Sequence, residues 1–331
     1  MNDGSAGMAL CGRLWCLARL YFGALACIGF GNRTSRRFVD VTVIVNPISG
    51  GGRGLIAAEG LCAALEARGA QATLMPTGRA GDAERFSRDA ACDCVVGVGG
   101  DGTLNEIVNG IGEKAIRVGI LPRGTANVVS RELKIPKKVE LYADLVVSGQ
   151  MRRMDAGLRD GRRFLLGAGA GLDAAVTKRV MSRRGKKSSY LRWIWPTIAT
   201  VFQYRFPKMA VEVDGQRVME DAQYAIVGNC VYSAGLFPAT PKAKVNDGLL
   251  DVCLFRNLSY LRMLKLPIVV WRPSFIEHKD VYYGQSRQVS FMPAEGEAVP
   301  LQIDGDPAGE VPATFGIEPN AVEIIAPVSR G

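Results

Sequence analysis

Residues 96–105 read VGVGGDGTLN, and the order of residue types in this stretch decides the fold class. The apolar residues that precede Gly99 are typical of a buried strand, and the residues after Gly102 favour a helix. Glycines in such a loop let the backbone approach a ligand closely, and the N-terminus of the helix presents unpaired N–H groups to an anion. The stretch therefore predicts one strand–loop–helix unit of an α/β fold with a phosphate-binding loop.

The spacing Gly97-x-Gly99-x-x-Gly102 also matches the dinucleotide-binding fingerprint. That fingerprint requires an acidic residue about 20 positions later, which holds the ribose hydroxyls. Residues 120–124 read ILPRG and contain no carboxylate, and the chain has no GxxxxGK[ST] string of a P-loop. We therefore interpret residues 99–103 as a phosphate loop of another kind, with Gly97 in the preceding strand.

The chain divides into two parts that differ in their pattern of apolar and polar residues. Apolar strands alternate with helices at first, with strands expected over residues 39–45, 71–75, 94–98 and 118–121 and helices over 55–68, 82–90 and from about 103. Further along the chain, short segments in which apolar and polar residues alternate are expected to be strands, over residues 209–213, 222–227, 250–255, 289–292 and 300–303. Helices are expected near residues 172–180 and 191–204. The first pattern predicts parallel βαβ units and the second an antiparallel domain. We expect an N-terminal Rossmann-like three-layer α/β domain over residues 39–148 and a β-rich, sandwich-like domain over residues 149–331, with the active site between them.

Two further polar, glycine-containing loops follow expected parallel strands. NPISGGGRG occupies residues 46–54, after the first strand, and PRGTAN occupies residues 122–127, after the fourth. The carboxyl ends of parallel strands meet at one edge of a sheet, where open α/β folds bind ligands. Three such loops predict one shared site.

The amino-acid composition limits the catalytic schemes that the protein can use. The 331 residues carry a formal net charge of +9, which suits an anionic partner, and His278 is the single histidine of the chain. Ser-His-Asp and Cys-His schemes are thereby nearly excluded, so that acid–base chemistry falls to carboxylates, lysines or the substrate itself. The eight cysteines show no CxxC spacing and are typical of reduced, buried thiols.

Residues 1–38 form an extension of a different character. Arg13 and Arg19 interrupt its apolar stretch, whereas a membrane span needs about 20 apolar residues. Three interpretations stay open: an amphipathic helix at a membrane surface, a signal-like segment, and an over-long start-site assignment.

Five motifs together resemble the diacylglycerol kinase catalytic family, which includes bacterial lipid kinases and sphingosine kinases. In chain order they are VNPISGGGRG, GVGGDGTLNEIVNGI, LPRGTANVVSRELKIP, NDGLLDV and QIDGDP, within about residues 40–328. GGDGT is shared with NAD kinases and polyphosphate-dependent kinases, whereas GTAN, DGLLD and the late DGD are specific to the lipid-kinase branch. The resemblance implies an ATP-dependent lipid kinase that uses Mg²⁺ and acts in phospholipid metabolism.

The resemblance also implies a nucleotide site. The residues that would hold ATP are Asn46, Thr77, Gly99, Gly100, Asp101, Gly102, Thr103, Leu104, Asn105 and Thr125. For Asp101 two interpretations stay open: it is a catalytic partner of the Mg²⁺–ATP complex, or it caps the helix that follows. Arg53 and Arg123 supply positive charge to the site or are ordinary surface arginines.

A lipid hydroxyl loses its proton as it attacks, so a carboxylate general base is expected. In the family the acid of a late DGE turn has this role, and here the turn is Asp304-Gly305-Asp306. The resemblance thus implies Asp306 as the base, one methylene shorter than glutamate. A hairpin turn alone would explain Asp304 better than Asp306.

KVNDGLLDV, at residues 244–252, resembles a loop that holds a structural Mg²⁺ in bacterial members. The implied ligands are the Asp247 side chain and the carbonyl oxygens of Lys244 and Leu249, which are the hard oxygen ligands that Mg²⁺ prefers. A plain Asn-Asp-Gly hairpin is the alternative.

Basic and aromatic residues gather before and within YLRWIWP, at residues 190–196. They are Lys178, Arg179, Arg183, Arg184, Lys186, Lys187 and Arg192, with Tyr190, Trp193 and Trp195. They suit an anionic membrane surface or form an ordinary solvated helix face, and no nucleic-acid-binding module accompanies them. We expect a peripheral protein at the cytoplasmic face of the membrane with a lipid substrate. A soluble NAD kinase and a lipid- or nucleotide-binding protein without transfer activity are the rivals.

Overall fold

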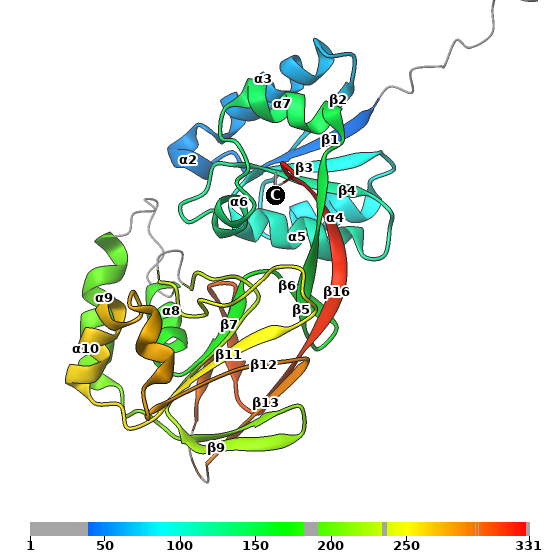
Figure 1. The fold of residues 1–331 in the computed structure, drawn as a ribbon. Coiled ribbons are helices and arrows are strands. Elements are labelled where there is room, and N and C mark those ends of the chain that lie inside the picture. The colour runs from blue at the N-terminus through cyan, green and yellow to red at the C-terminus, as the bar shows by residue number, and fades with distance from the viewer. Residues whose placement is uncertain (1–38, 182–190, 234–236, 295, 297, 329–331) are drawn as a thin grey trace, which may run out of the picture. The chain divides into compact units, whose positions relative to one another are not determined.

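The computed structural model describes residues 39–181, 191–233, 237–294, 296 and 298–328 (Figure 1). The interfacial helix expected within residues 1–38 lies outside the described residues. So do Arg183, Arg184, Lys186, Lys187 and Tyr190 and the side chains of Arg192, Trp193 and Trp195. Within the described part of the chain, no helix has the length and apolar character needed to cross a membrane.

The first half is the predicted α/β domain. Its elements are β1 (Asp40–Val45), α2 (Ser49–Gly52), α3 (Gly54–Glu66), β2 (Gln71–Pro76), α4 (Asp82–Asp89), β3 (Cys94–Gly99), α5 (Asp101–Ile111), β4 (Arg117–Pro122), α6 (Val128–Glu132) and α7 (Val139–Ser148). The four strands are parallel in the order β2-β1-β3-β4. All six residues of β3 are buried, as expected for a strand covered on both faces. Helices α3 and α7 pack together on one face, and α4 and α5 pack on the other (Figure 1).

The second half is the predicted antiparallel domain. Its elements are β5 (Met151–Arg159), β6 (Arg162–Phe164), β7 (Gly167–Ala170), α8 (Leu172–Met181), α9 (Leu191–Gln203), β8 (Met209–Val213), β9 (Gln216–Ala222), β10 (Tyr224–Gly228), β11 (Leu250–Phe255), α10 (Tyr260–Val269), the 3₁₀ helix η1 (Pro273–Glu277), β12 (Val281–Ser286), β13 (Gln288–Pro293), β14 (Pro300–Ile303), β15 (Asp306–Glu310) and β16 (Ala313–Ile325). One sheet has the order β12-β11-β10-β7-β14-β15. Phe164, Phe291 and Phe315 fill the core of this half, with edge-on ring contacts at 6.1 and 5.4 Å.

Strand β16 joins the two halves. It pairs antiparallel with β13 and β5, and at Ile324 it pairs parallel with Val118 of β4. A single sheet therefore runs β2-β1-β3-β4-β16-β13-β8-β9. The predicted fold class is confirmed, whereas the boundary between residues 148 and 149 stays a prediction.

Candidate active site

The loops after β1 and β2 lie at the same edge of the sheet as the phosphate loop. The N–H of Asn46 donates to the carbonyl oxygen of Val98 at 3.2 Å. The N–H and the hydroxyl of Thr77 both donate to the carbonyl oxygen of Val45, at 2.8 and 3.2 Å. The parallel pairing of β1 with both β2 and β3 thus places Asn46 and Thr77 at the same edge of the sheet as the phosphate loop.

The loop after β4 is bound directly to the phosphate loop. The carbonyl oxygen of Gly99 accepts the N–H groups of Arg123 and Gly124 at 2.7 and 2.9 Å. A Cβ atom on Gly124 would lie 2.5 Å from the Cα atom of Gly100, so glycine is required where the two loops meet. Thr125 follows in this loop and is exposed. The three predicted loops are therefore brought together.

The glycines of the phosphate loop differ in what surrounds them. A Cβ atom on Gly97 would lie 2.8 Å from the side chain of Ile107, and one on Gly99 would lie 2.5 Å from the hydroxyl of Thr103. These two glycines are needed for packing. A Cβ atom on Gly102 would meet no atom within 4 Å, and the Gly102 N–H has no partner among the described residues. The open space beside the loop is therefore at Gly102.

Asp101 links two loops. Its Oδ2 accepts the N–H of Val128 at 3.0 Å, and its Oδ1 accepts the N–H of Val129 at 3.1 Å. Helix α5 begins at Asp101 and has Gly100 at its N-cap without a side-chain bond, so the interpretation of Asp101 as the cap of its own helix is wrong. It instead holds the first turn of α6. Burial raises the pKa of Asp101, and the hydrogen bonds from the backbone oppose that rise.

Thr103 and Leu104, the next residues of the predicted ATP site, help to form helix α5. The N–H groups of Thr103 and Leu104 donate to the carbonyl oxygen of Gly100, at 3.1 and 3.2 Å. The side chain of Leu104 is fully buried in the hydrophobic core. The Leu104 side chain therefore anchors α5 in the core and is not available to contact a ligand.

Asp304 connects the late DGD turn to the phosphate-loop helix. Its carboxylate accepts the Asn105 side-chain N–H at 2.9 Å and the backbone N–H groups of Leu165, Leu166 and Gly167 at 2.8, 2.8 and 3.1 Å. Burial raises its pKa to about 6, and the backbone hydrogen bonds oppose the rise. Asn105 and Asp304 are thus brought together although 199 positions separate them.

Asp306 begins β15 on the far side of the same turn. Asp304 and Gly305 have φ values of 50° and 87°, and Ile303 pairs with Asp306, which is a two-residue hairpin. The hairpin interpretation of this turn is correct, and Asp304 has the additional contacts described above. Asp306 itself is exposed, and its role as a base stays a prediction.

A second set of contacts beside Asn105 was not predicted from the sequence. The side-chain N–H of Asn109 donates to the backbone carbonyl oxygens of Asn105 and Arg163 at 3.0 Å each, and its side-chain Oδ1 accepts the Arg163 backbone N–H at 3.0 Å. Arg163 forms a two-pronged ion pair with Glu318, at 2.7 and 2.6 Å. The spacing of four residues between Asn105 and Asn109, which places both amides on one side of a helix, is the signal that could have indicated this contact surface.

The Asp247 loop leads into β11. β10 and β11 are adjacent antiparallel strands, but the whole of residues 229–249 connects them, so Asn246-Asp247-Gly248 is not the turn of a tight hairpin and the plain hairpin interpretation is wrong. Asp247 is exposed. Its Oδ1 accepts the N–H of Leu249 at 3.2 Å, and its Oδ2 accepts the side-chain N–H of Gln285 at 3.3 Å.

The donors at this loop fit only a loosely held cation. Among the described residues no group of three His, Cys, Asp or Glu side chains could hold a metal ion. The Gln285 amide also donates to Asp251 at 3.1 Å, so a second carboxylate lies close to that of Asp247. One exposed carboxylate with a second one close by suits a hydrated Mg²⁺ rather than a closed site.

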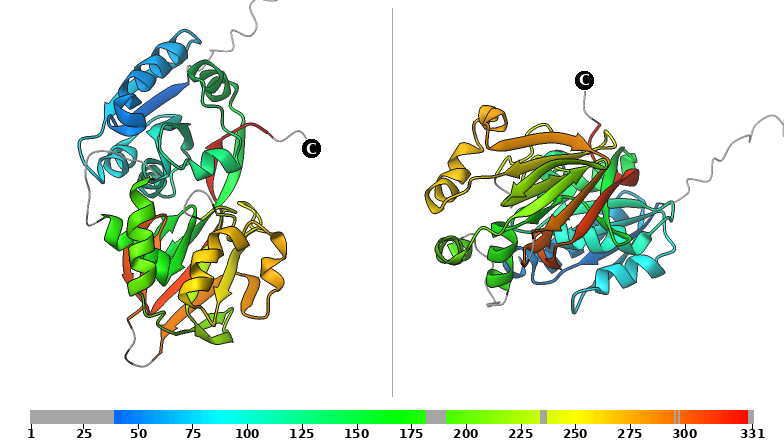
Figure 2. Two further views of the ribbon diagram at one scale, coloured as in Figure 1. Left: turned by 90° about the vertical axis from the view of Figure 1, so that its left-hand side faces the viewer. Right: turned by 90° about the horizontal axis from the view of Figure 1, so that it is seen from below.

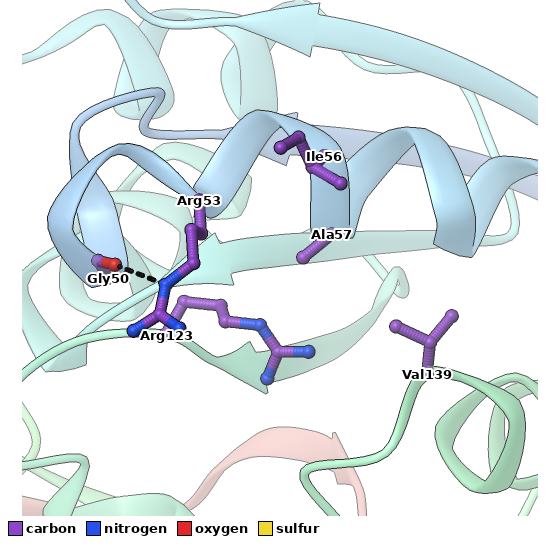
Figure 3. Close-up of a pocket in the computed structure, with 6 residues that line it drawn as sticks. All are labelled: Gly50, Arg53, Ile56, Ala57, Arg123 and Val139. Carbon is purple, nitrogen blue, oxygen red and sulfur yellow. Dashed lines mark hydrogen bonds between the residues drawn. The ribbon is translucent and has the colours of Figure 1, made fainter.

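Two arginines line a cavity beside the first loop. The cavity has a volume of about 460 Å³ and is lined by Gly50, Arg53, Ile56, Ala57, Arg123 and Val139 (Figure 3). Arg53 donates to the carbonyl oxygen of Gly50 at 3.2 Å, and Arg123 donates to that of Pro122 at 2.9 Å. Burial, and then the charge of Arg53, lower the pKa of Arg123. Two cations that face one cavity favour an anionic ligand over ordinary surface positions.

Part of the predicted basic cluster lines a second cavity. Its volume is about 420 Å³, and its lining includes Lys178 and Arg179 of α8 with Pro300 of β14 and Glu310 of β15. Lys178 lies 3.9 Å from Glu310. These two basic residues therefore face the hairpin that carries Asp306.

Comparison with family models covers most of the chain. The model described as the diacylglycerol kinase catalytic domain matches residues 40–158, and the model described as a YegS C-terminal NAD kinase beta sandwich-like domain matches residues 167–326. The first match covers the α/β half and most of β5, and the second covers the antiparallel half from β7 onward.

Individual relatives agree with these matches. A diacylglycerol kinase of Mycobacterium tuberculosis is 28% identical over 297 residues, which cover 87% of this chain and 95% of the relative. A diacylglycerol kinase of Staphylococcus carnosus is 26% identical over 268 residues, or 80% and 87% of the two chains. A crystal structure from Bacillus anthracis has the same fold, with a TM-score of 0.72 at 24% identity over 90% of this chain and 98% of that one.

Proposed function

Because the chain belongs to the diacylglycerol kinase catalytic family, we propose that it is a lipid kinase that transfers the γ-phosphate of ATP to the hydroxyl group of a lipid. The hydrogen bond between Asn105 and Asp304 is the observation that supports this most directly. It ties the helix of the phosphate loop to the turn that carries the predicted base. Donor and acceptor groups must be held in this way for phosphoryl transfer, which depends on positioning and charge neutralisation.

The ATP phosphates are proposed to lie over Gly102. The backbone there is open, and the N-terminus of α5 offers N–H groups and the positive end of a helix dipole. The remaining predicted ATP contacts, from Asn46, Thr77 and Thr125, lie in loops at the same edge of the sheet. Arg53 and Arg123 add positive charge beside them.

Asp101 is proposed to position the site. Both of its carboxylate oxygens already accept backbone N–H groups of α6, which suits a fixed anchor better than a metal ligand. Mg²⁺, when bound with ATP, would neutralise the charge of the phosphates. A separate structural Mg²⁺ would be held by the Asp247 side chain and the carbonyl oxygens of Lys244 and Leu249.

Asp306 is proposed as the general base. As the acceptor oxygen attacks the γ-phosphorus, the hydroxyl proton passes to the Asp306 carboxylate and ADP leaves. Asp304 is the poorer candidate because its carboxylate already accepts four hydrogen bonds. Its contribution is to hold the turn against α5.

The acceptor is proposed to be diacylglycerol or a related lipid or sphingoid alcohol, met at the anionic inner face of a membrane by peripheral association, without nucleic acid. NAD is the second candidate acceptor, because the family model that matches residues 167–326 is described by its NAD kinase beta sandwich. Radiolabelled ATP with a panel of diacylglycerol, phosphatidylglycerol, sphingosine, ceramide and NAD tests both. Label in the lipid extract supports the proposal, label in NADP supports the second candidate, and nucleotide binding without any transfer contradicts both.

A further inference from the structure

Large apolar side chains are exposed on α9, α10 and the turn after α10. Of the twelve large exposed hydrophobic residues among those described, eight lie between Ile198 and Trp271. Four of them form what we call the outer face of α10: Leu261, Leu264, Ile268 and Trp271, which are 71, 41, 71 and 58% exposed. Such a concentration on one surface marks an interaction site.

The outer face of α10 is not needed to hold the helix in place. Met263 and Val270 are buried in a core cluster, and Leu266 packs against the same cluster. The spacing of Leu261, Leu264 and Ile268, three and four residues apart, places them together on a different side of the helix. The helix therefore has one apolar side for the protein interior and a second apolar side in solvent.

Helix α9 extends this surface. Helices α9 and α10 are in contact at the outer side of the antiparallel half (Figures 1 and 2). Phe202 of α9 stacks on Tyr260 with ring centroids 6.2 Å apart and planes at 27°, and both rings are exposed. Tyr and Trp at the edge of an apolar patch are typical of membrane interfaces.

The charges around the surface are of one sign. Residues 191–211 and 259–276 contain no Asp or Glu. Arg262 pairs with Asp280 at 2.8 Å, while the exposed Arg205, Lys265 and Arg272 have no acidic partner in the part of the chain that the structure describes. Beyond this surface Glu277 and Lys279 are both exposed and offset each other. An apolar face flanked by cations complements an anionic lipid surface.

We infer that the outer face of α10, with Phe202 and Tyr260, docks onto an anionic bilayer. Aliphatic side chains enter the boundary of the acyl chains, while Lys265 and Arg272 contact lipid phosphates. This inference rests on the proposed function in one respect, because a lipid kinase must reach an acceptor that stays in a membrane. It names the surface that would do so, which differs from the basic cluster of α8.

Flotation of the full chain with vesicles tests the inference without ATP or acceptor. Vesicles of phosphatidylcholine alone are compared with vesicles of equal parts phosphatidylcholine and phosphatidylglycerol. The wild-type protein should bind the second kind. Leu261→Glu/Ile268→Glu should lower the vesicle partition coefficient at least about a hundredfold, and Lys265→Glu/Arg272→Glu should lower it at least about thirtyfold.

Leu141→Glu is the matched control, because Leu141 is a similarly exposed leucine on α7. It should bind vesicles as the wild type does. Equal vesicle binding by the wild type and the α10 variants would overturn the inference, and so would a wild type that binds neither vesicle. A wild type that self-associates, and that Leu261→Glu/Ile268→Glu converts to a monomer without any vesicle binding, would assign the surface to a second copy and also overturn it.

A short-chain, water-soluble diacylglycerol separates this inference from the proposed function. The α10 variants should phosphorylate it at the wild-type rate and lose turnover only on acceptor carried in vesicles. Vesicle binding that depends on α10, without turnover on any acceptor, would refute the kinase proposal and leave the docking surface in place. Wild-type turnover on both acceptors by the α10 variants would refute the docking surface alone.

Discussion

Replacing Gly102 with alanine should separate ligand binding from stability at the phosphate loop. A Cβ atom there would meet no protein atom within 4 Å, and Gly102 lies in the first turn of α5. Alanine is favoured over glycine within a helix by about 0.5–1 kcal/mol, so the Tm should stay equal or rise. If the methyl group displaces a phosphate from one N–H group, a charge-assisted hydrogen bond worth about 1.5–3 kcal/mol is lost, and the Kd for ATP should rise about 10- to 150-fold.

Calorimetric titration with ATP and thermal unfolding of the same preparation measure both effects. Gly60→Ala is the control, because Gly60 lies within α3 and its methyl group would be in ordinary contact, 4.0 Å from Val139. Its stability should rise without a change in ATP affinity. Gly99→Ala should lose stability as well as binding, since its Cβ atom would lie 2.5 Å from the Thr103 hydroxyl. A Gly102→Ala protein with the wild-type Kd would refute the placement of the phosphates over this residue.

Three further predictions concern carboxylates. Asp306→Asn should lower turnover at least about a hundredfold at unchanged Tm, and wild-type turnover by this variant would exclude Asp306 as the base. Asp304→Asn should instead lower the Tm, because the single amide oxygen cannot accept all four hydrogen bonds of the carboxylate. Asp173 lies in the first turn of α8, where its carboxylate accepts the side-chain N–H of Gln302. Burial raises the pKa of Asp173 from 3.8 to about 6, so the folded state holds this proton more tightly than the unfolded chain, and the free energy of unfolding should fall as the pH rises from about 4 to about 6. Urea titrations at several pH values should show a smaller fall in the free energy of unfolding for Asp173→Asn than for the wild type. The same pH dependence in both proteins would contradict a raised pKa for Asp173. Millimolar Mg²⁺ without nucleotide should raise the Tm of the wild type and not that of Asp247→Asn, and an equal rise in both would place the cation elsewhere.

The fold could be predicted because its signals are local. The β-branched run of residues 39–45 becomes β1, and the predicted strand over residues 94–98 ends one residue later, at Gly99, in β3. Short alternating runs predicted the antiparallel half, since the alternation of side chains along a strand is set by neighbouring residues. The three loops could be grouped because parallel strands end at one edge.

The contacts of the site could not be predicted in the same way. Asp101 caps a helix 27 residues further along the chain, and Asp304 binds Asn105 across 199 positions. Both residues had an adequate local explanation, as a helix cap and as a hairpin turn, and no local pattern shows which distant N–H group a carboxylate accepts. The family resemblance identified the loops and the residues of the site. It did not indicate that Asp304 binds α5 while Asp306 stays exposed, because that difference depends on tertiary structure.

Strand β16 has a consequence for biosynthesis. Until residues 313–325 have been made, β4 has β3 as its one strand partner in the described sheet, and its other edge offers unpaired N–H and carbonyl groups to any passing strand. The α/β half is translated first and yet obtains its last strand from β16, which follows every other strand in chain order. A nascent or truncated polypeptide that stops before Ala313 should therefore aggregate, and the N-terminal half should not fold productively on its own.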